Sequence, residues 1–267
     1  MPINVSIVIY KHTVAEIQPL VDVLREADCV SEIFLIDNSP FRQDQFVDLG
    51  VTYIFNNQNI GYGAAHNIAI RRTLEQNIPY HLVLNPDIIF QSEILAKIDA
   101  FMNNNSNIGL LMPKVYYPNG EIQYLCKLLP TPFDLIFRRF LPKAWTKKRA
   151  DVFELRASGY NRIMDVPYLS GCFMFLKTES VREVGLFDER FFMYPEDIDL
   201  TRRMHQKYRT VFYPQVSVVH QHAQGSYVVG RLLFIHMKNM IKYFNKWGWF
   251  FDAERRIINN ETLKQLK

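Results

Sequence analysis

The sequence predicts an α/β fold with a mostly parallel central sheet and flanking helices. Short runs of β-branched and aromatic residues alternate with segments whose apolar residues recur at helical spacing. The first strands end in small polar residues, and a glycine-containing loop at residues 61–63 opens a helix. Parallel strands joined by crossover helices bind ligands at their carboxyl ends. We therefore expect the functional site at that edge of the sheet.

The first half of the chain alternates strands and helices. The expected strands cover residues 5–10, 32–36, 51–55, 80–84 and 108–117. The expected helices cover residues 16–26, 61–76 and 92–102, and Ser92 can cap the last of them. A turn at residues 118–120 and a return strand at 121–124 together predict a hairpin.

The second half is less regular. Residues 126–165 mix prolines, aromatic and basic residues, which predicts a long loop or a helical insertion rather than a separate domain. Residues 166–177 return to strand character, interrupted at Ser170-Gly171, where a backbone can approach a ligand closely. A short helix ends at Gly185, an acidic motif opens the next helix, and strands follow at 210–213 and 216–220.

Composition narrows the class of protein. A chain of 267 residues with 48% apolar content can bury the core of an enzyme-sized domain. No apolar run is long enough to span a bilayer and no signal-peptide pattern is present, so we expect a cytoplasmic protein. The three cysteines are widely spaced, which disfavours a disulfide framework or a zinc site. Basic residues cluster only at 138–149 and the net charge is +4, which disfavours a nucleic-acid partner.

The most informative motif runs from Tyr194 to Arg203 and holds the carboxylates of Glu196, Asp197 and Asp199. At the start of a helix such acids can be caps, and Asp199 with Arg203 can form an ordinary i,i+4 pair. A second acidic signal, Asp87, follows a buried strand in the segment Leu84-Asn85-Pro86-Asp87. Two carboxylate sites together suggest a metal-assisted active site.

The segment Asn57-x-Asn59-x-Gly61 offers amide side chains and backbone donors beside a helix N-terminus, which suits a ribose or a diphosphate. A simple turn at Asn57 is the alternative. The glycine pattern does not complete the dinucleotide-binding fingerprint and follows the third strand rather than the first, so a nicotinamide dehydrogenase is disfavoured.

In order and spacing, these motifs resemble the inverting family 2 glycosyltransferases, in particular the bacterial rhamnosyltransferase-like group. The resemblance covers roughly the first 220 residues. The matching segments are residues 5–9, 37–39, 57–67, 84–87, 169–171, 185–192, 194–203 and 219–220. The resemblance implies a GT-A fold, a sugar-nucleotide donor and a divalent metal.

The resemblance implies a donor site at one group of residues. They are Tyr10, Asp37, Asn38, Asn57, Asn59, Gly61, Asn67, Asn85 and Asp87. In similar enzymes a carboxylate placed like Asp37 accepts the N3–H of a pyrimidine, which uracil and thymine both present. The donor is therefore a dTDP-sugar or a UDP-sugar, and the subgroup favours dTDP-rhamnose. An Asx turn through Pro40 is the alternative role for Asp37.

For the metal, the resemblance implies Mn²⁺ or Mg²⁺. Asn85-Pro86-Asp87 keeps only the last carboxylate of the family's D-x-D segment, so Asp87 needs help. By analogy His220 is the extra ligand, and an imidazole would favour Mn²⁺. A structural role for His220 is an alternative, and His222 is the competing ligand.

For catalysis, inversion requires a carboxylate that accepts the proton of the acceptor hydroxyl. We predict Asp197 as this base, with Glu196 as the alternative base and Asp199 as a structural residue. The acceptor is expected at Gly171, Tyr194 and Glu196, whereas Phe191 is expected in the core.

We divide the chain into a GT-A domain at 1–225 and a C-terminal helical extension at 226–267. The domain comprises a nucleotide-sugar-binding half at 1–117 and an acceptor and catalytic half at 118–225. Residues 228–246 interleave apolar and basic side chains, a pattern typical of a helix on an anionic membrane or of one packed on the domain. With the basic, aromatic region 133–149, it favours peripheral contact with the inner face of the cytoplasmic membrane.

The resulting hypothesis is transfer of L-rhamnose from dTDP-rhamnose to a hydroxyl of a polyprenyl-diphosphate-linked intermediate of a surface polysaccharide or O-antigen. The alternative within the fold is a UDP-sugar transferase for galactofuranose, galactose or an N-acetylhexosamine. Two other classes stay open, a nucleotidyltransferase and a non-catalytic sugar-nucleotide-binding protein. The first strand lacks the glycine-rich phosphate loop expected of a nucleotidyltransferase, since residues 10–13 contain no glycine.

Overall fold

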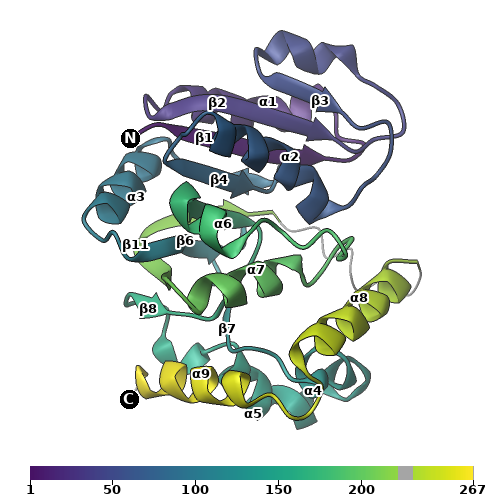
Figure 1. The fold of residues 1–267 in the computed structure, drawn as a ribbon, viewed down its shortest axis with the longest axis vertical. Helices are drawn as coiled ribbons and strands as arrows, with labels where there is room; N and C mark the ends of the chain where they lie inside the picture. The colour runs from purple at the N-terminus through teal and green to yellow at the C-terminus, as the bar shows by residue number, and fades with distance from the viewer. Residues whose placement is uncertain (222–230, 267) are drawn as a thin grey trace.

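A nine-stranded mixed sheet forms the centre of the protein (Figure 1). The computed structural model describes residues 1–221 and 231–266. The strand order is β3-β2-β1-β4-β10-β6-β11-β5, and β8 pairs with β11. The strands of this sheet are β1 (Ile3–Ile9), β2 (Val30–Asp37), β3 (Thr52–Phe55), β4 (Tyr80–Leu84), β5 (Ile88–Ile89), β6 (Ile108–Tyr116), β8 (Met164–Asp165), β10 (Phe173–Lys177) and β11 (Arg209–His220).

Most of the strands point the same way. β1 pairs in parallel with β2 and β4, β2 with β3, and β6 with β11. β10 is antiparallel to both β4 and β6, so β6 and β11 share the direction of β4. The short strands β5 and β8 run antiparallel to β11. The predicted mostly parallel sheet is confirmed, and the carboxyl ends of six strands meet at one edge.

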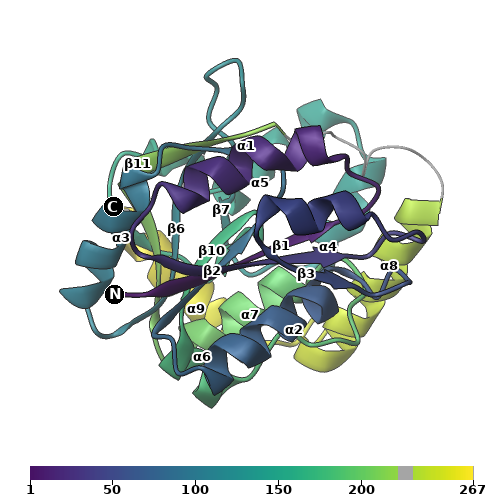
Figure 2. The same ribbon diagram turned by 90° about the horizontal axis from the view of Figure 1, so that it is seen from above.

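Helices cover both faces of the sheet. Figure 2 shows α1 (Val14–Arg25) on one face and α2 (Tyr62–Glu75), α6 (Thr178–Val184) and α7 (Glu196–His205) on the other. Residues of α3 (Glu93–Asn103) join the same apolar cluster as α1. Ile33 and Leu35 of β2 face this cluster, whereas Phe34 and Ile36 pack against α2. Burial on both faces explains why the strands read as continuous apolar runs.

Several sequence predictions about local structure were wrong. In place of the predicted return strand at 121–124, the structure has a single antiparallel bridge between Tyr116 and Ile122. The Gln123 amide donates to the Val115 carbonyl, and the ladder ends there. The two predicted strands at 210–220 are one strand, β11, with a register shift after Tyr213. The Ser92 hydroxyl bonds Glu26 instead of capping α3.

The 126–165 segment folds as a helical insertion, one of the two predicted alternatives. Its elements are β7 (Cys126–Lys127), α4 (Pro132–Leu135), α5 (Lys143–Phe153), and 3-10 helices at Phe137–Phe140 and Arg156–Ser158. Outside this segment, a further 3-10 helix covers Asp44–Leu49. β7 pairs with β9 (Tyr168–Leu169) in a separate two-stranded ladder. The basic cluster is partly neutralised, since Arg149 pairs with Asp134 and Lys147 with Asp151.

The C-terminal segment forms two helices, α8 (Arg231–Trp247) and α9 (Ala253–Lys264), both within the region 226–267 that was predicted to be helical. One face of α8 buries Met240, Tyr243 and Phe244 against Phe191 and Ile198. The core position predicted for Phe191 is confirmed. The predicted start of this helix at 228 and the domain boundary at 225 lie outside the described residues. Among the described helices, none has the length and apolarity needed to cross a bilayer.

A buried chain of hydrogen bonds crosses the sheet at β1. The Thr73 hydroxyl uses its only proton to donate to the Ala69 carbonyl. Its oxygen therefore accepts a hydrogen bond from His81 Nδ1–H, at 2.8 Å. Ser6 Oγ, 2.8 Å from His81 Nε2, therefore donates to it. The Ser6 oxygen in turn accepts a hydrogen bond from His66 Nδ1–H, at 2.7 Å. Both histidines are thus neutral, and burial lowers the pKa of His66 and brings that of His81 to about 3.

This pair makes the protein sensitive to acid. Below the ordinary histidine pKa of 6.5, the unfolded chain takes up protons that the folded protein excludes, so the free energy of unfolding falls as the pH drops from 6.5 towards 3. We expect His81 alone to account for about 2 kcal/mol between pH 7 and pH 5. Urea denaturation at both pH values should show this loss in the wild type and a smaller loss in His81→Gln. His12→Gln, near the surface, is the control, and equal pH dependence of all three proteins would contradict the prediction.

Candidate active site

The loops at the carboxyl edge of the sheet bring together residues from distant parts of the sequence. Tyr10 follows β1, Asp37 ends β2 and Asp87 lies between β4 and β5. His220 ends β11, and its imidazole Nε2 lies 3.3 Å from Asp87 Oδ1. Gly171 reaches the same edge because it precedes β10, which runs in the opposite direction. The sheet topology therefore gathers these loops where the sequence analysis expected a site.

Asp197 is held by two backbone amides at the start of α7. Its Oδ2 accepts from the Gly171 amide at 3.1 Å, and its Oδ1 accepts from the Ile198 amide at 2.8 Å. Burial raises the pKa of Asp197, and the two amide hydrogen bonds oppose that rise because they favour the anion. Asp197 is thus a carboxylate in a fixed orientation at the edge of the sheet.

Glu196 differs from its neighbour. It is buried, and its Oε2 has no hydrogen-bond partner among the described residues. Burial, together with the negative charge of Asp197, holds the pKa of Glu196 well above its usual range. The two adjacent acids therefore differ in their surroundings: two backbone amides favour the anion of Asp197, whereas burial without a hydrogen-bond partner at Oε2 favours the neutral form of Glu196.

Tyr62 connects the loop that holds Asp197 with the loop that contains Asp87. Its hydroxyl lies 2.6 Å from the Gly171 carbonyl and 3.1 Å from Asn85 Oδ1, and it donates to both. The Tyr62 amide donates to the Phe192 carbonyl at 2.9 Å. Gly61 makes this approach possible, since its φ is +95° and a Cβ there would lie 2.3 Å from the Phe192 oxygen.

His220 is oriented by Gln123. The Gln123 side-chain amide donates to the His220 carbonyl at 2.8 Å, so its Oε1 faces His220 Nδ1 at 3.0 Å and accepts a proton from it. The lone pair of His220 therefore lies on Nε2, on the side of Asp87 and of the Asn85 amide at 3.4 Å. An outer-shell partner that sets the tautomer in this way is typical of a metal-binding histidine.

Asp87 and His220 are suitable as two ligands of a divalent metal whose other ligands are not protein side chains. Two adjacent ligands of an octahedral ion bound at about 2.1 Å are roughly 3 Å apart, close to the 3.3 Å between Asp87 Oδ1 and His220 Nε2. Within residues 1–221 and 231–266, no group of three or more histidine, cysteine or acidic residues could hold a metal. Water and phosphate oxygens would have to complete the shell. The competing ligand His222 lies outside the described residues.

The predicted base-binding corner is already hydrogen-bonded. Asp37 Oδ1 accepts from the Ser39 amide at 2.8 Å, which is the Asx turn of the alternative reading, and Oδ2 accepts from Tyr53 Oη at 2.6 Å. Asn38 bonds both Asn56, at 2.8 Å, and the Gly61 carbonyl, at 3.1 Å. Each Asp37 oxygen keeps a second lone pair, so the corner is preorganised and can still accept a hydrogen bond.

The other predicted donor residues lie in different surroundings. Asn59 accepts from the Gly61 amide at 3.0 Å, and Asn57 has a φ of +54°, which asparagine tolerates in a turn. Tyr10 is 45% exposed after β1. Asn67 is fully buried, and its amide bonds the backbone N–H and carbonyl of Phe187. In this structure the hydrogen bonds of Asn67 hold the 187–189 segment, and its contact with the donor stays a prediction.

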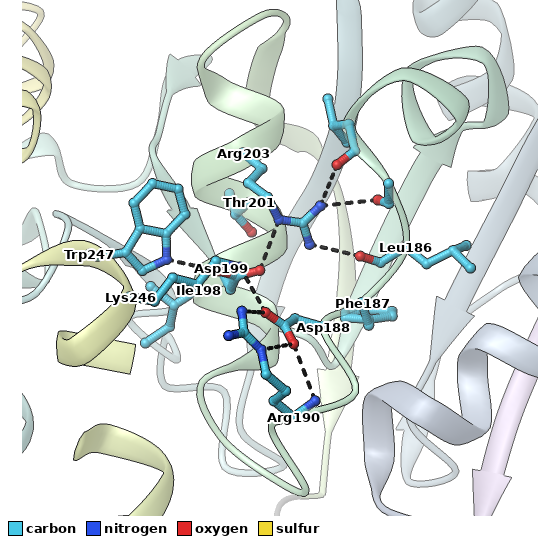
Figure 3. Close-up of polar contacts among 12 residues, drawn as sticks. Leu186, Phe187, Asp188, Arg190, Ile198, Asp199, Thr201, Arg203, Lys246 and Trp247 are labelled. Atoms are coloured by element: carbon cyan, nitrogen blue, oxygen red, sulfur yellow. Dashed lines mark hydrogen bonds and ion pairs between the residues drawn. The ribbon is translucent and has the colours of Figure 1, made fainter. Parts of the chain in front are cut away.

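Asp199 and Tyr194 lie on the side of α8. Asp199 is fully buried and accepts from Arg203 Nε at 2.8 Å, Trp247 Nε1 at 2.8 Å and Lys246 Nζ at 2.6 Å (Figure 3). Lys246 also pairs with Asp188 at 2.8 Å. The structural role predicted for Asp199 agrees with this network. Tyr194, predicted to contact the acceptor, packs its ring edge-on to His236 of α8 at 5.3 Å.

Comparison with proteins of known function finds distant sequence relatives. No family model matches the chain. It is 26% identical over 189 residues to the N-acetylglucosaminyl-diphospho-decaprenol L-rhamnosyltransferase of Mycobacterium tuberculosis, a match covering 63% of this chain and 58% of that protein. It is 25% identical over 216 residues to the rhamnosyltransferase WbbL of Escherichia coli, a match covering 77% of this chain and 75% of the relative.

Solved structures share the fold. The structure of GalNAc-T7 with UDP, GalNAc and Mn²⁺ aligns with a TM-score of 0.65 at 18% identity, over 92% of this chain and 48% of the other. Staphylococcus aureus TarS aligns with a TM-score of 0.61 at 16% identity, over 99% of this chain and 43% of TarS. The chain therefore has a GT-A fold, and its sequence is distantly related to rhamnosyltransferases. The match spans 58% of the length of the mycobacterial relative.

At the carboxyl edge of this GT-A fold, sequence reasoning missed three supporting residues. Tyr62 lies between Gly61 and Gly63 in a motif that was interpreted from its glycines and asparagines alone. Its position in that motif could have indicated a role. Gln123 falls in a segment expected to be a strand, and nothing in the sequence marks it as the partner of His220. Lys246 belongs to a helix interpreted as a membrane or packing surface, and its pairing with the buried Asp199 and the partly buried Asp188 follows only from the fold.

Proposed function

We propose that this protein is an inverting, metal-dependent glycosyltransferase that moves L-rhamnose from dTDP-rhamnose to a hydroxyl of a polyprenyl-diphosphate-linked acceptor during surface-polysaccharide synthesis. The observation that carries the proposal is the Asp197 carboxylate, held by two backbone amides at the edge that also contains the Asp87–His220 pair. The printed names of the mycobacterial and Escherichia coli relatives support rhamnose as the sugar and, in the first, a decaprenyl-diphosphate acceptor.

Asp197 acts as the general base. It accepts the proton of the acceptor hydroxyl as that oxygen attacks the anomeric carbon from the face opposite the leaving diphosphate. The amides of Gly171 and Ile198 hold both carboxylate oxygens, so the base is oriented before the acceptor arrives. Burial and the charge of Asp197 raise the pKa of Glu196, which disfavours a second negative charge beside the base. Gly171, Tyr194 and Glu196 are proposed to line the acceptor side.

Asp87 and His220 would hold Mn²⁺ or Mg²⁺, and the donor diphosphate would provide further ligands. When bound, the metal neutralises the charge that develops on the leaving diphosphate. Asp37 and Asn38 are proposed to receive the thymine base, with Asn57, Asn59, Gly61 and Asn85 along the ribose and diphosphate. A UDP-sugar is the competing donor, because GalNAc-T7 and TarS have both been solved with UDP.

We also propose peripheral contact with the inner face of the cytoplasmic membrane, where a polyprenyl-linked acceptor would be found. Large aromatic side chains are exposed on the insertion and on α8, with Trp145 80% and Phe234 71% accessible. Lysines stand beside them in both segments. Exposed aromatic and basic side chains on one surface suit an anionic membrane.

Donor turnover tests the proposal. Hydrolysis and transfer would be measured across dTDP- and UDP-sugars with Mn²⁺, with Mg²⁺ and with chelator. We expect dTDP-rhamnose to be consumed only with metal, and Asp87→Ala to lose at least about tenfold in activity. Asp44→Ala, with an exposed acid in the same half of the chain, is the control. Turnover of a UDP-sugar alone would replace the donor, and pyrophosphate release from a nucleoside triphosphate would indicate a nucleotidyltransferase.

Gln123 provides a finer test of the metal site. Gln123→Met removes the acceptor that keeps the proton on His220 Nδ1. The proton can then move to Nε2, which leaves that nitrogen without a lone pair for the metal. We expect the affinity for Mn²⁺ to fall by about 10–100-fold, measured as free Mn²⁺ in an electron paramagnetic resonance titration of the unreacted protein. The exposed Gln45→Met is the control. Unchanged Mn²⁺ affinity in Gln123→Met would remove His220 from the metal site.

A further inference from the structure

A large cavity lies away from the catalytic edge of the sheet, between the 126–165 insertion and α9. Its volume is about 870 Å³, within the range of roughly 300–1,000 Å³ found for ligand-binding pockets. Buried apolar side chains of Leu128, Leu129 and Phe153 line it from the insertion. The loop after α8 and the first turns of α9 line the other side. The cavity is therefore an apolar groove between two segments far apart in the sequence.

The rim of this cavity exposes large apolar side chains. Phe250 is 73% exposed, Phe251 99%, Ile257 57% and Val152 52%. All four line the cavity. Water contact of this extent is unfavourable, and a group of such residues around one hollow indicates a binding surface.

The charges that a ligand would meet at the cavity are positive. Arg149 is 47% exposed through its side chain and Arg256 is exposed, and both line the cavity. The two acids of the lining, Asp134 and Asp252, have side chains only 4% exposed. Asp134 is covered by Arg149, and Asp252 is paired with Arg202. An apolar hollow with accessible guanidinium groups suits an anionic amphiphile.

The cavity is also joined to the loop that holds the proposed base. Leu128 directly follows β7, and Lys127 of β7 pairs with Tyr168 of β9. Gly171, whose amide holds Asp197, comes three residues after Tyr168, a length of at most about 10 Å of extended chain. One pair of short strands thus connects the wall of the cavity to the catalytic edge.

We propose that this cavity binds the polyprenyl chain of the lipid-linked acceptor, with Arg149 and Arg256 beside its phosphate groups. The proposal rests on the function proposed above and adds where the apolar part of the acceptor lies. A polyprenyl chain is apolar along its length and carries phosphate at one end, which matches the lining and the rim. Binding there directs the glycan end of the acceptor along β7 and β9 towards Asp197.

Binding of farnesyl phosphate, below its micelle concentration, tests the cavity without any transfer reaction. Titration calorimetry of the full chain would compare the wild type with the double variant Phe251→Ser/Ile257→Ser. The matched control is Phe41→Ser/Phe234→Ser, because Phe41 and Phe234 are also exposed, at 79% and 71%, but do not line the cavity. We expect the wild type and control to bind equally and the cavity variant at least about tenfold more weakly. Arg256→Ala should weaken farnesyl phosphate but not farnesol.

Two outcomes would overturn the proposal. One is undetectable binding by the wild type, or equal binding by the cavity variant. The other is farnesyl phosphate bound only when phosphatidylglycerol vesicles are present and lost equally in both double variants, which would assign the exposed side chains to general membrane contact.

Transfer assays separate this inference from the proposed function. With a decaprenyl-diphosphate acceptor, the cavity variant should raise KM at least about tenfold with kcat unchanged, whereas an acceptor carrying a methyl group in place of the lipid should give equal KM in all variants. Absence of transfer to every acceptor would count against the proposed function, while the farnesyl phosphate titration would still decide whether the cavity holds a polyprenyl phosphate.

Discussion

Asp197→Asn is expected to lower kcat for sugar transfer by about 10²–10⁴-fold, the usual contribution of a general base. Asparagine keeps the shape of the side chain and can still accept from the Gly171 amide, but it cannot take the proton of the acceptor hydroxyl. Glu196→Gln is expected to retain activity within a few-fold, because burial favours the neutral form of Glu196, which glutamine resembles. The two substitutions therefore distinguish neighbouring acids of the same helix turn.

The measurement is steady-state transfer to acceptor for both variants, with donor binding followed separately to establish that each site is intact. The pH profile adds a second readout. Since burial raises the pKa of Asp197, activity should fall at a higher pH than an ordinary aspartate would give as the solution is acidified. If Glu196→Gln lost as much activity as Asp197→Asn, or Asp197→Asn remained active, the assignment of the base would be reversed or lost.

Arg202→Met is expected to lower the free energy of unfolding by about 3–5 kcal/mol, the cost of removing one partner of a buried ion pair. Arg202 lies on α7 and is 1% exposed. It donates to both oxygens of Asp252, at 2.8 and 2.9 Å, and to Glu254 at 2.6 Å. Its guanidinium also lies 4.0 Å from the centre of the Trp247 ring. Without it, the nearly buried Asp252 carboxylate has lost its main counter-charge.

Urea denaturation of the wild type and variants measures this loss. Arg42→Met is the matched control, because Arg42 pairs with Asp44 where both side chains are more than half exposed, and an exposed ion pair contributes little to stability. The double variant Arg202→Met/Asp252→Asn should recover part of the stability, since no uncompensated charge remains, and it provides a folded comparison if the single variant is unstable. A loss in Arg202→Met no larger than in Arg42→Met would contradict the prediction.

These two predictions concern opposite ends of one helix. α7 begins with the proposed base, and its middle turns are joined to the C-terminal helices through Asp199 with Lys246 and Arg202 with Asp252. The C-terminal segment, interpreted from sequence as an extension, therefore contributes to the position of α7. Lys246 and Trp247 lie on the last turn of α8 and contact the buried Asp199, and Lys246 also pairs with Asp188 (Figure 3).

The sequence by itself determined the fold class and the family resemblance, because both depend on local signals. Apolar periodicity marked the alternating strands and helices of the first half, since burial on one or both faces leaves a repeat that is readable within ten residues. Motif order and spacing identified the glycosyltransferase resemblance. The signals failed where the local pattern was weak, at the predicted return strand 121–124.

Only the tertiary structure decided the surroundings of each candidate site residue. The choice between Glu196 and Asp197 depends on the Gly171 amide, 26 residues earlier, and the tautomer of His220 depends on Gln123, 97 residues away. Asn67 looked like a donor-site residue in its motif but is buried against Phe187. Protonation and hydrogen bonding are set by whichever groups the fold brings within about 3 Å, and a one-dimensional pattern carries no record of those contacts.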